Sequence, residues 1–467
     1  MYINFTNKTN RNKIYFIINW KSRINDKNIL NYVDKIKFEK WELFKIEEIN
    51  YIKNNKKNTD LLVIIRNNKK LENIIEDIVI KVWNKIIEHN TKFSMSFKKL
   101  GIDEKIQELF IELLAQKLYK YNEFKDNKIK YSINIDTNAN IEKLEKMINT
   151  LYFIRDLQNK PANILNPETY ENIVKDIFKD NKNIKIEVIK WEELKKIWAN
   201  WIYSVGKWSV NPPRIIILKY EKQKNKPFTA LVGKWVTFDS GGYNIKPTWY
   251  MEDMHLDMWG SAIALWIFKF LVENNYQWNL VCSLWIVENL VSWKSYTPTD
   301  IIKMYNWKTV QVANTDAEWR IVLADTLAYT EDKFKIEKIF DFATLTGAAI
   351  VALWWEIIAI MWTNKKLNEK IQKLSFKLKE YAWELPLFEK YKSHIKADFA
   401  DIKNIWKWRE AWTITAGLFL KEFVKNENWV HFDIAWPDIM KNHPLYGTWW
   451  TAIWIRLIST FLNNSQE

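Results

Sequence analysis

Residues 231–247, LVGKWVTFDSGGYNIKP, place a lysine in an apolar, strand-like run and follow it with Asp239 in a Ser-Gly-Gly turn and then Lys246. The next stretch, MEDMHLDMWGSAIAL (251–265), sets Asp257 just before an apolar helical pattern. A strand, a polar turn and a helix in this order are typical of an α/β sheet, where functional side chains gather at the strand ends. The two stretches therefore predict a parallel strand with charged residues at its carboxyl end.

The same alternation continues through the second part of the chain. Six segments have the apolar, β-rich composition of strands, and three have helical spacing. The pattern predicts a larger C-terminal α/β domain with a mostly parallel central sheet flanked by helices. The strand-like segments are 183–189, 214–220, 228–234, 279–287, 338–345 and 430–435, and the helix-like segments are 261–274, 320–332 and 413–426.

The first part of the chain predicts a separate, small α/β domain. Residues 1–137 alternate short β-rich runs with helical stretches, and residues 138–158 have the spacing of a linker helix. Two prolines in 159–170 mark the start of the second domain. A chain of 467 residues is also too long for one compact core. We therefore expect domains at 1–137 and 159–467, joined by the helix 138–158.

Bulk properties favour a cytoplasmic protein that does not enter a membrane. The single cysteine, Cys282, excludes an internal disulfide, which suits a reducing compartment. The longest apolar tract, 348–362, carries Glu356 and is too short to span a bilayer. The apolar run 14–20 is interpreted as a strand rather than a signal peptide, because no cleavage site follows it.

The formal net charge of +14 is concentrated towards the first third of the chain. Such an excess attracts nucleic acid, so a DNA-binding or scaffold protein is one hypothesis. The lysines alternate with acidic residues and form no compact cluster with interleaved aromatics. A chain that favours Lys, Asn and Ile at unconstrained positions, as in KNNKKN (53–58), also explains the excess, and we prefer this explanation.

Glycine occurs only 9 times in the chain, and tryptophan 28 times. Ordinary proteins contain roughly 7% glycine, which is the residue that adopts positive φ in tight turns. Several tryptophans stand where turn chemistry asks for glycine, as in the pairs Trp354–Trp355 and Trp449–Trp450. We therefore expect many of them to be glycine in the native product, through a UGA codon that the source decodes as glycine. The alternative is a protein that is genuinely rich in tryptophan.

The stretch NTDAEWR (314–320) carries two carboxylates one residue apart. In an extended segment Asp316 and Glu318 point the same way, and they repel unless positive charge lies between them. With Asp239 and Asp257 they make four carboxylates, which two divalent cations would balance. Oxygen-rich sets of this kind hold paired metals that activate water. The sequence has no His-Glu-x-x-His motif, phosphate loop or nucleophile elbow that would indicate another chemistry.

These stretches resemble the leucyl aminopeptidases, a family of hexameric, two-zinc cytosolic exopeptidases. NTDAEWR is similar to the family signature Asn-Thr-Asp-Ala-Glu-Gly-Arg, with Trp319 in the glycine position. Trp235 and Trp259 likewise replace glycine in stretches that resemble the family's metal-binding segments. This repeated departure supports the decoding hypothesis. The resemblance covers about residues 150–467 and continues in DFATLTGA (341–348), ADIKNIWKWREAWTITAGLFLKEF (400–423) and HFDIAW (431–436).

Carried over position by position, the resemblance implies a two-metal site for Zn²⁺ or Mn²⁺. Asp239 and Glu318 would bridge the two ions, and Lys234 would bind as a neutral amine. Lys246 would polarise the scissile carbonyl, and Arg320 would hold a bicarbonate ion that relays a proton. The implied metal ligands are Lys234, Asp239, Asp257, Asp316 and Glu318.

The resemblance also implies a substrate and an assembly. The substrate would be a peptide with a free N-terminus and a leucine-type first residue, whose α-amine binds one metal. The protein would be a cytoplasmic homohexamer, with nucleic acid as a possible but less favoured partner of the basic N-terminal third. The positions that would line the pocket for the first side chain and the adjacent backbone are Met254, Thr344, Leu345 and Gly347.

Overall fold

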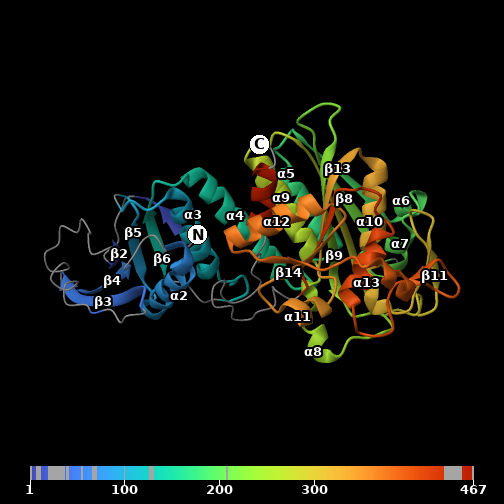
Figure 1. Cartoon of the computed structure of the whole chain (residues 1–467), viewed down its shortest axis with the longest axis horizontal. Helices are drawn as coiled ribbons and strands as arrows, with labels where there is room; N and C mark the ends of the chain where they lie inside the picture. Colours follow the sequence, from blue (N-terminus) through green and yellow to red (C-terminus); the bar gives the residue numbers. More distant parts are fainter. Residues whose placement is uncertain are drawn as a thin grey trace. The chain divides into compact units, whose positions relative to one another are not determined.

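The computed structural model describes residues 3–6, 12–18, 37, 42–53, 56–65, 71–98, 100–125, 131–206, 209–435 and 455–464. The chain divides into two compact units, Met1–Tyr152 with Lys441–Thr451 and Phe153–Met440 with Ala452–Glu467 (Figure 1). The division falls inside helix α4 (Ile141–Gln158). The domain bounds expected from the sequence stay a prediction.

The first unit contains a six-stranded sheet in the order β1-β6-β5-β2-β4-β3. Its neighbouring strands pair in parallel except for β3 and β4, which are antiparallel. Helix α2 buries an apolar stripe with helical spacing, which includes Ile75, Ile78, Val82 and Ile86. The elements are β1 (Ile3–Phe5), β2 (Asn12–Ile18), β3 (Phe44–Lys53), β4 (Lys56–Ile65), α2 (Leu71–His89), β5 (Lys92–Ser96), α3 (Glu104–Leu118) and β6 (Ser132–Asp136).

The second unit is built on an eight-stranded sheet in the order β15-β14-β17-β13-β9-β10-β8-β7. The four central strands, β17, β13, β9 and β10, pair in parallel, and β7, β8 and β14 run antiparallel to a neighbour. The eight strands are β7 (Ile184–Lys190), β8 (Arg214–Tyr220), β9 (Phe228–Asp239), β10 (Asn279–Asn289), β13 (Ile336–Ala343), β14 (Ile358–Trp362), β15 (Ala382–Glu384) and β17 (Trp429–Asp433).

Helices cover both faces of this sheet, with α9 on one face and α10 on the other (Figure 1). A second, three-stranded sheet, in the order β11-β12-β16, is separate from the main sheet. The predicted fold class, a mostly parallel central sheet flanked by helices, is confirmed. The helices and remaining strands are α5 (Pro167–Phe178), α6 (Trp191–Lys196), α7 (Asn200–Gly206), α8 (Thr248–Met251), η2 (Met254–Leu256), α9 (Trp259–Glu273), β11 (Ile301–Lys303), β12 (Thr309–Gln311), η3 (Thr315–Ala317), α10 (Trp319–Lys333), α11 (Ala348–Leu353), α12 (Lys365–Leu378), η4 (Glu389–Ile395), β16 (Ile402–Lys403), α13 (Trp412–Lys421) and α14 (Ile455–Asn464).

The central strands are buried along nearly their whole length, as expected for parallel strands covered on both faces. Ala230 and Val232 of β9 belong to the same buried cluster as Ile321 and Leu327 of α10. This shared core packs α10 against β9, and the acidic residues lie at the carboxyl end of β9 and just before α10.

Helix α9 crosses the sheet in backbone contact with it. A Cβ atom added to Gly260 would overlap the carbonyl oxygen of Phe342 in β13, and one added to Gly233 would overlap Cα of Ser261. Two positions without a side chain therefore let the start of α9 approach β9 and β13 closely. The approach brings Asp257, which precedes α9, against Lys234.

Two local expectations are corrected by the structure. The strand expected at 228–234 continues to Asp239, because β9 pairs with β10 along its whole length, so Lys234 lies inside the strand rather than at its end. Residues 314–320 are not extended: they form the 3₁₀ turn η3 and the start of α10, with Asn314 capping the turn through Asp316 N at 2.7 Å. The carboxylates still converge, through the turn rather than through strand alternation.

Among the described residues, one helical stretch, Thr248–Glu273, is long and apolar enough to cross a membrane by composition. Its most apolar window is 89% buried inside the fold, as in a core helix of a globular protein. The apolar tract 348–362 forms α11 and β14 of the second unit.

Candidate metal centre

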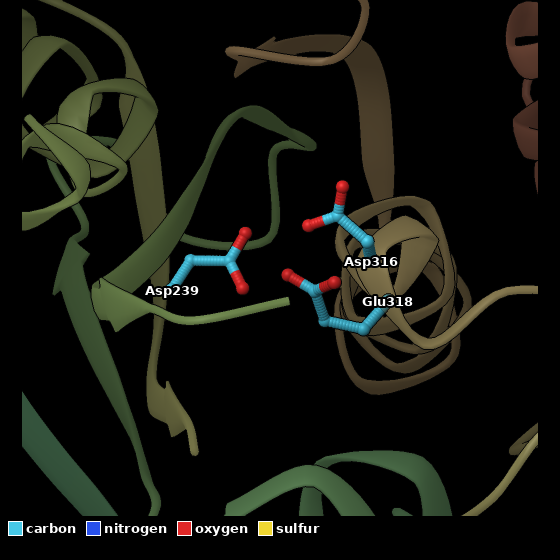
Figure 2. Close-up of side chains that lie close together, drawn as sticks. All are labelled: Asp239, Asp316 and Glu318. Carbon is cyan, nitrogen blue, oxygen red and sulfur yellow. The ribbon is translucent and has the colours of Figure 1, made fainter. Parts of the chain in front are cut away.

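Three carboxylates converge at the end of β9. One oxygen from each of Asp239, Asp316 and Glu318 lies within 4.8 Å of the other two. Figure 2 shows Asp239 reaching from the strand towards the other two side chains, which come from the η3 turn and the residue directly before α10. Asp239 and Glu318 are fully buried, so their charges face one another in a medium of low polarity.

A buried lysine and a fourth carboxylate lie in the same part of the fold. Lys234 Nζ forms an ion pair with Asp257 Oδ1, and Thr344 Oγ1 donates to the same oxygen at 2.8 Å. The other oxygen, Asp257 Oδ2, is buried and accepts no hydrogen bond from the residues that the structure describes. A buried carboxylate oxygen of this kind can take a proton or bind a cation.

The electrostatics of the cluster favour a bound cation. Burial, followed by the neighbouring Asp239, raises the pKa of Asp316 to about 6 and raises the pKa of Glu318 well above its ordinary value. Burial also raises the pKa of Asp257 to about 6, although Lys234 opposes the shift. Added positive charge would favour the ionised forms of these carboxylates, and hard divalent cations prefer such oxygen ligands. The residues present therefore fit a metal centre.

Two further cationic side chains flank the carboxylates. Lys246 Nζ lies 2.9 Å from Asp239 Oδ2 and also contacts Asp316 Oδ1. Arg320, in the first turn of α10, is buried, and burial lowers its pKa to about 10 against the opposing effect of Asp433. Arg320 Nε has no hydrogen-bond partner among the described residues.

The orientation of Asp239 depends on residues that the sequence did not single out. Asp239 Oδ1 accepts hydrogen bonds from Gly241 N at 2.8 Å and from Asn289 Nδ2 at 2.7 Å. Tyr296 Oη in turn donates to Asn289 Oδ1 at 3.1 Å. With Oδ1 occupied in this way, Oδ2 faces Lys246.

The turn that carries Asp316 is held by a second asparagine. Asn404 is fully buried, and its side-chain oxygen accepts from Ala313 N at 2.8 Å and Asn314 N at 3.3 Å. Its amide donates to Asn314 O at 2.6 Å and Ala317 O at 3.3 Å. Asn404 is a short polar residue directly after β16, in a segment that resembles the family. Its position in the sequence alone assigns it no role.

The expected pocket residues occupy the loop after β13 and the η2 turn. Asp433 Oδ1 accepts from Leu345 N at 3.0 Å and Thr346 N at 3.2 Å, which fixes the loop that carries Thr344 and Leu345. Leu345 is fully buried, and Gly347 is the N-cap of α11. Met254 lies in η2, partly exposed, three residues before Asp257. The structure thus brings Thr344 directly to the lysine–carboxylate pair.

An indole also lies among these charged groups. The ring of Trp319 is centred 4.1 Å from Lys234 Nζ and 5.1 Å from Lys246 Nζ. Its Nε1 is buried and finds no hydrogen-bond partner in the described part of the chain. The two lysines that flank the carboxylates therefore share a large apolar neighbour.

Comparison with known proteins identifies relatives over most of the chain. The family model described as "Cytosol aminopeptidase family, catalytic domain" matches residues 152–458. A probable cytosol aminopeptidase of Pseudomonas fluorescens (strain Pf0-1) is 39% identical over 306 residues, 65% of this chain and 59% of that protein. One of Clostridium perfringens is 35% identical over 358 residues, 73% of this chain and 72% of the relative.

A solved structure extends the similarity to the whole fold. The crystal structure of cytosol aminopeptidase from Coxiella burnetii has a TM-score of 0.86 and 26% sequence identity. The match covers 100% of this chain and 99% of that one. The alignment with the first Pseudomonas relative, by contrast, spans less than two thirds of that relative's length.

Proposed function

The chain belongs to the cytosol aminopeptidase family of metal-dependent hydrolases, and from this premise we propose that it releases N-terminal residues, with a leucine-type preference, from peptides. The observation that carries the proposal is the convergence of Asp239, Asp316 and Glu318 beside the buried Lys234–Asp257 pair. Four carboxylates and two lysines leave a net negative site, which suits cations and the positive α-amine of a peptide.

Five side chains would hold two divalent cations, with Asp239 and Glu318 shared between them. When bound, the two ions, Zn²⁺ or Mn²⁺, would lower the pKa of a water molecule and polarise the scissile carbonyl. The buried, unpaired Asp257 Oδ2 supports this assignment, because it points to a missing positive partner. The five proposed ligands are Lys234, Asp239, Asp257, Asp316 and Glu318.

Lys234 must be a neutral amine to serve as a ligand. Two adjacent dications would favour that form, because they oppose the positive charge of the amine. Thr344 Oγ1 donates to Asp257 Oδ1 at 2.8 Å and so helps to orient the carboxylate beside Lys234.

Lys246 and Arg320 would act without binding metal. Lys246 Nζ lies at the edge of the carboxylate group, where it can donate to the carbonyl oxygen that gains charge in the transition state. Arg320 would hold a bicarbonate ion, which would supply a general base beside the site. Its buried Nε, which lacks a partner among the described residues, supports an anion at this position.

Four residues near the lysine–carboxylate pair would receive the first side chain and the adjacent backbone of the peptide. Leu345 offers an apolar wall, and Gly347 leaves the start of α11 without a side chain. The residues proposed for this pocket are Met254, Thr344, Leu345 and Gly347.

The assembly and location follow the same premise. We expect a cytoplasmic homohexamer, as the resemblance implies, and the named relatives are called cytosol aminopeptidases. The DNA-binding or scaffold hypothesis has no comparable support, because it rests on net charge alone.

The proposal is tested with leucine amide and its N-acetylated form as a matched pair of substrates. The free amine should be required, and a chelator should abolish hydrolysis that added Zn²⁺ or Mn²⁺ restores. Equal turnover of the two substrates, or full activity in the metal-free protein, would contradict an aminopeptidase.

A further inference from the structure

The backbone contains tryptophans in conformations that side chains rarely adopt. Nine non-glycine residues among those described have positive φ, and three of them are tryptophans: Trp198 at 59°, Trp307 at 71° and Trp354 at 65°. Trp354 combines its positive φ with a ψ of −164°, a region that is essentially restricted to glycine. Trp307 and Trp354 are also largely exposed, so no burial of the indole offsets the strain.

The packing of the buried Trp235 indole also indicates that this position does not suit a large side chain. The rings of Trp235 and Tyr170 are centred 3.3 Å apart and tilted by 42°. Aromatic pairs normally lie about 4.5–7 Å apart, so these two rings compete for one space.

Trp319 extends the argument to the metal centre. Its ring lies within 4.1 Å and 5.1 Å of the two lysines beside the carboxylates, so it occupies space next to the proposed cations. Residue 319 also lies between Glu318, a proposed bridging ligand, and Arg320 in sequence. A residue without a side chain removes this crowding and leaves the carboxylates in place.

We infer that residues 235, 307, 319 and 354 are glycine in the functional protein, and that UGA codons read as tryptophan account for the indoles. The inference rests on the proposed function only for residue 319, because the other three positions are argued from backbone angle and ring overlap. The same decoding at further positions would account for a chain with 28 tryptophans and 9 glycines.

Trp83 provides an internal control. It lies in the middle of α2 with ordinary helical geometry, and Lys117 Nζ packs 4.1 Å from its ring centre. Nothing at this position requires glycine, and glycine inside a helix would cost about 1 kcal/mol relative to alanine. Residue 83 should therefore be a genuine tryptophan encoded by UGG.

The test is peptide mass spectrometry of the protein purified from its source, together with the coding DNA. We expect the mass of glycine and a UGA codon at 235, 307, 319 and 354, and tryptophan with UGG at 83. Tryptophan masses at the four positions would overturn the inference. Because residue mass is measured without reference to activity, this result is separate from failure of the proposed aminopeptidase.

A second arm compares two synthetic genes in a host that uses the standard code. One gene encodes tryptophan as written, and the other encodes glycine at the four positions. The glycine protein should be more soluble and bind Zn²⁺ in direct metal analysis, whether or not it hydrolyses leucine amide. Equal solubility and equal Zn²⁺ binding by the two proteins would count against the inference.

An independent observation concerns Asn404. Its amide uses both acceptor sites and both donor hydrogens on the backbone of residues 313–317, which is the full capacity of that side chain. The geometry points to Asn404 as a positioning residue that holds Asp316 and the start of α10 in place for metal binding. It acts through the turn and touches no carboxylate in the structure's described hydrogen bonds.

Asn279 is a matched control for Asn404. It is equally buried and also fixes a loop, through Gln223 N at 2.7 Å, Gln223 O at 2.7 Å and Lys226 O at 2.9 Å. It begins β10, whereas the acidic cluster lies at the opposite end of the parallel strand β9. If Asn404 only stabilised the fold, its variants and Asn279→Ala would have the same Zn²⁺ affinity.

The experiment titrates Zn²⁺ alone into metal-free Asn404→Ala, Asn404→Asp and Asn279→Ala, with residue 319 as the mass spectrum identifies it. Both Asn404 variants should bind Zn²⁺ roughly 10–100-fold more weakly, the range known for groups that orient metal ligands. Asn279→Ala should lose stability and keep its Zn²⁺ affinity. Equal Zn²⁺ affinities for Asn404→Asp, Asn279→Ala and the parent protein would overturn the assignment.

Discussion

Lys246 Nζ lies 2.9 Å from Asp239 Oδ2 and also contacts Asp316, so one ammonium group joins the end of β9 to the turn before α10. Burial alone would lower the pKa of Lys246, but Asp239 and Asp316 together raise it above its ordinary value. The lysine therefore stays charged at neutral pH in the metal-free protein. It is a hydrogen-bond donor held beside the carboxylates. Its removal should therefore destabilise the transition state and lower kcat.

We expect Lys246→Ala to bind metal and to lose roughly 10²–10³ in kcat, the usual effect of removing one donor to a developing oxyanion. Steady-state kinetics on leucine amide and metal analysis of the same sample measure the two properties. Lys222→Ala, which removes an exposed lysine bonded to Asn275, should leave both unchanged. A Lys246→Ala protein with normal kcat would remove this residue from the mechanism.

Asp257→Asn should release metal and destabilise the metal-free protein. The change leaves Lys234 buried without its anionic partner, and breaking a buried ion pair in this way costs about 3–5 kcal/mol. Metal content and urea unfolding in the presence of a chelator report the two effects. Asp253→Asn, four residues earlier and only partly buried, is the control. Unchanged metal content in Asp257→Asn would exclude Asp257 as a ligand.

Gly260→Ala should destabilise the second unit, because the added Cβ overlaps the carbonyl oxygen of Phe342 and α9 must move away from β13. We expect a loss of about 1–3 kcal/mol or more in the free energy of unfolding. Gly101→Ala adds a Cβ with no atom within 4 Å and only strains a positive φ, so it separates overlap from backbone strain. Thermal unfolding of both variants distinguishes them, and equal losses would argue against a tight crossing.

Glu171 should contribute to stability in a pH-dependent way. It is 2% exposed and pairs with Lys175 at 2.6 Å, Lys190 at 3.1 Å and Arg214. Burial raises its pKa, but the three cations lower it overall below 4.5. A depressed pKa gives stability that is present above the unfolded-state pKa near 4.5 and is lost as the pH falls through the folded-state value.

Urea unfolding at a series of pH values tests this expectation. Glu171→Gln should be less stable than the parent protein at pH 7, and the difference should shrink below pH 4.5, where the parent's own carboxylate becomes protonated. Glu168→Gln, an exposed neighbour in the first turn of α5, should show a much smaller difference. A difference that stays constant down to the lowest pH would show that charge is not the cause.

The long, buried elements could be predicted because their composition alone reports them. Strands β8, β10 and β13 are rich in apolar residues, and they lie close to where the sequence places them. The sequence does not predict β14 and the edge strand β15, because five and three residues are too short for a periodic signal. The antiparallel direction of β7 and β8 also cannot be predicted from the composition of either segment.

In the site, residue chemistry could be predicted but orientation could not. The carboxylates stand out as acidic residues in apolar surroundings, and Asp239, Asp316 and Glu318 do come together. Asn289 and Asn404 gain their roles only from contacts with residues 50 and 90 positions away, respectively. Turn geometry at 314–318 likewise depends on Asn404, which is why the extended conformation expected there was wrong.

The Asn404 clamp has a consequence for synthesis on the ribosome. Every proposed ligand precedes residue 319, whereas Asn404, which holds the turn of Asp316, is synthesised 86 residues after Glu318. Chains grow at about 5–20 residues per second, so Asn404 follows the acidic residues by roughly 4–17 seconds. A fragment that stopped short of residue 404 would contain every proposed ligand and lack the side chain that holds the turn of Asp316. We therefore expect tight metal binding only after residue 404 has been synthesised.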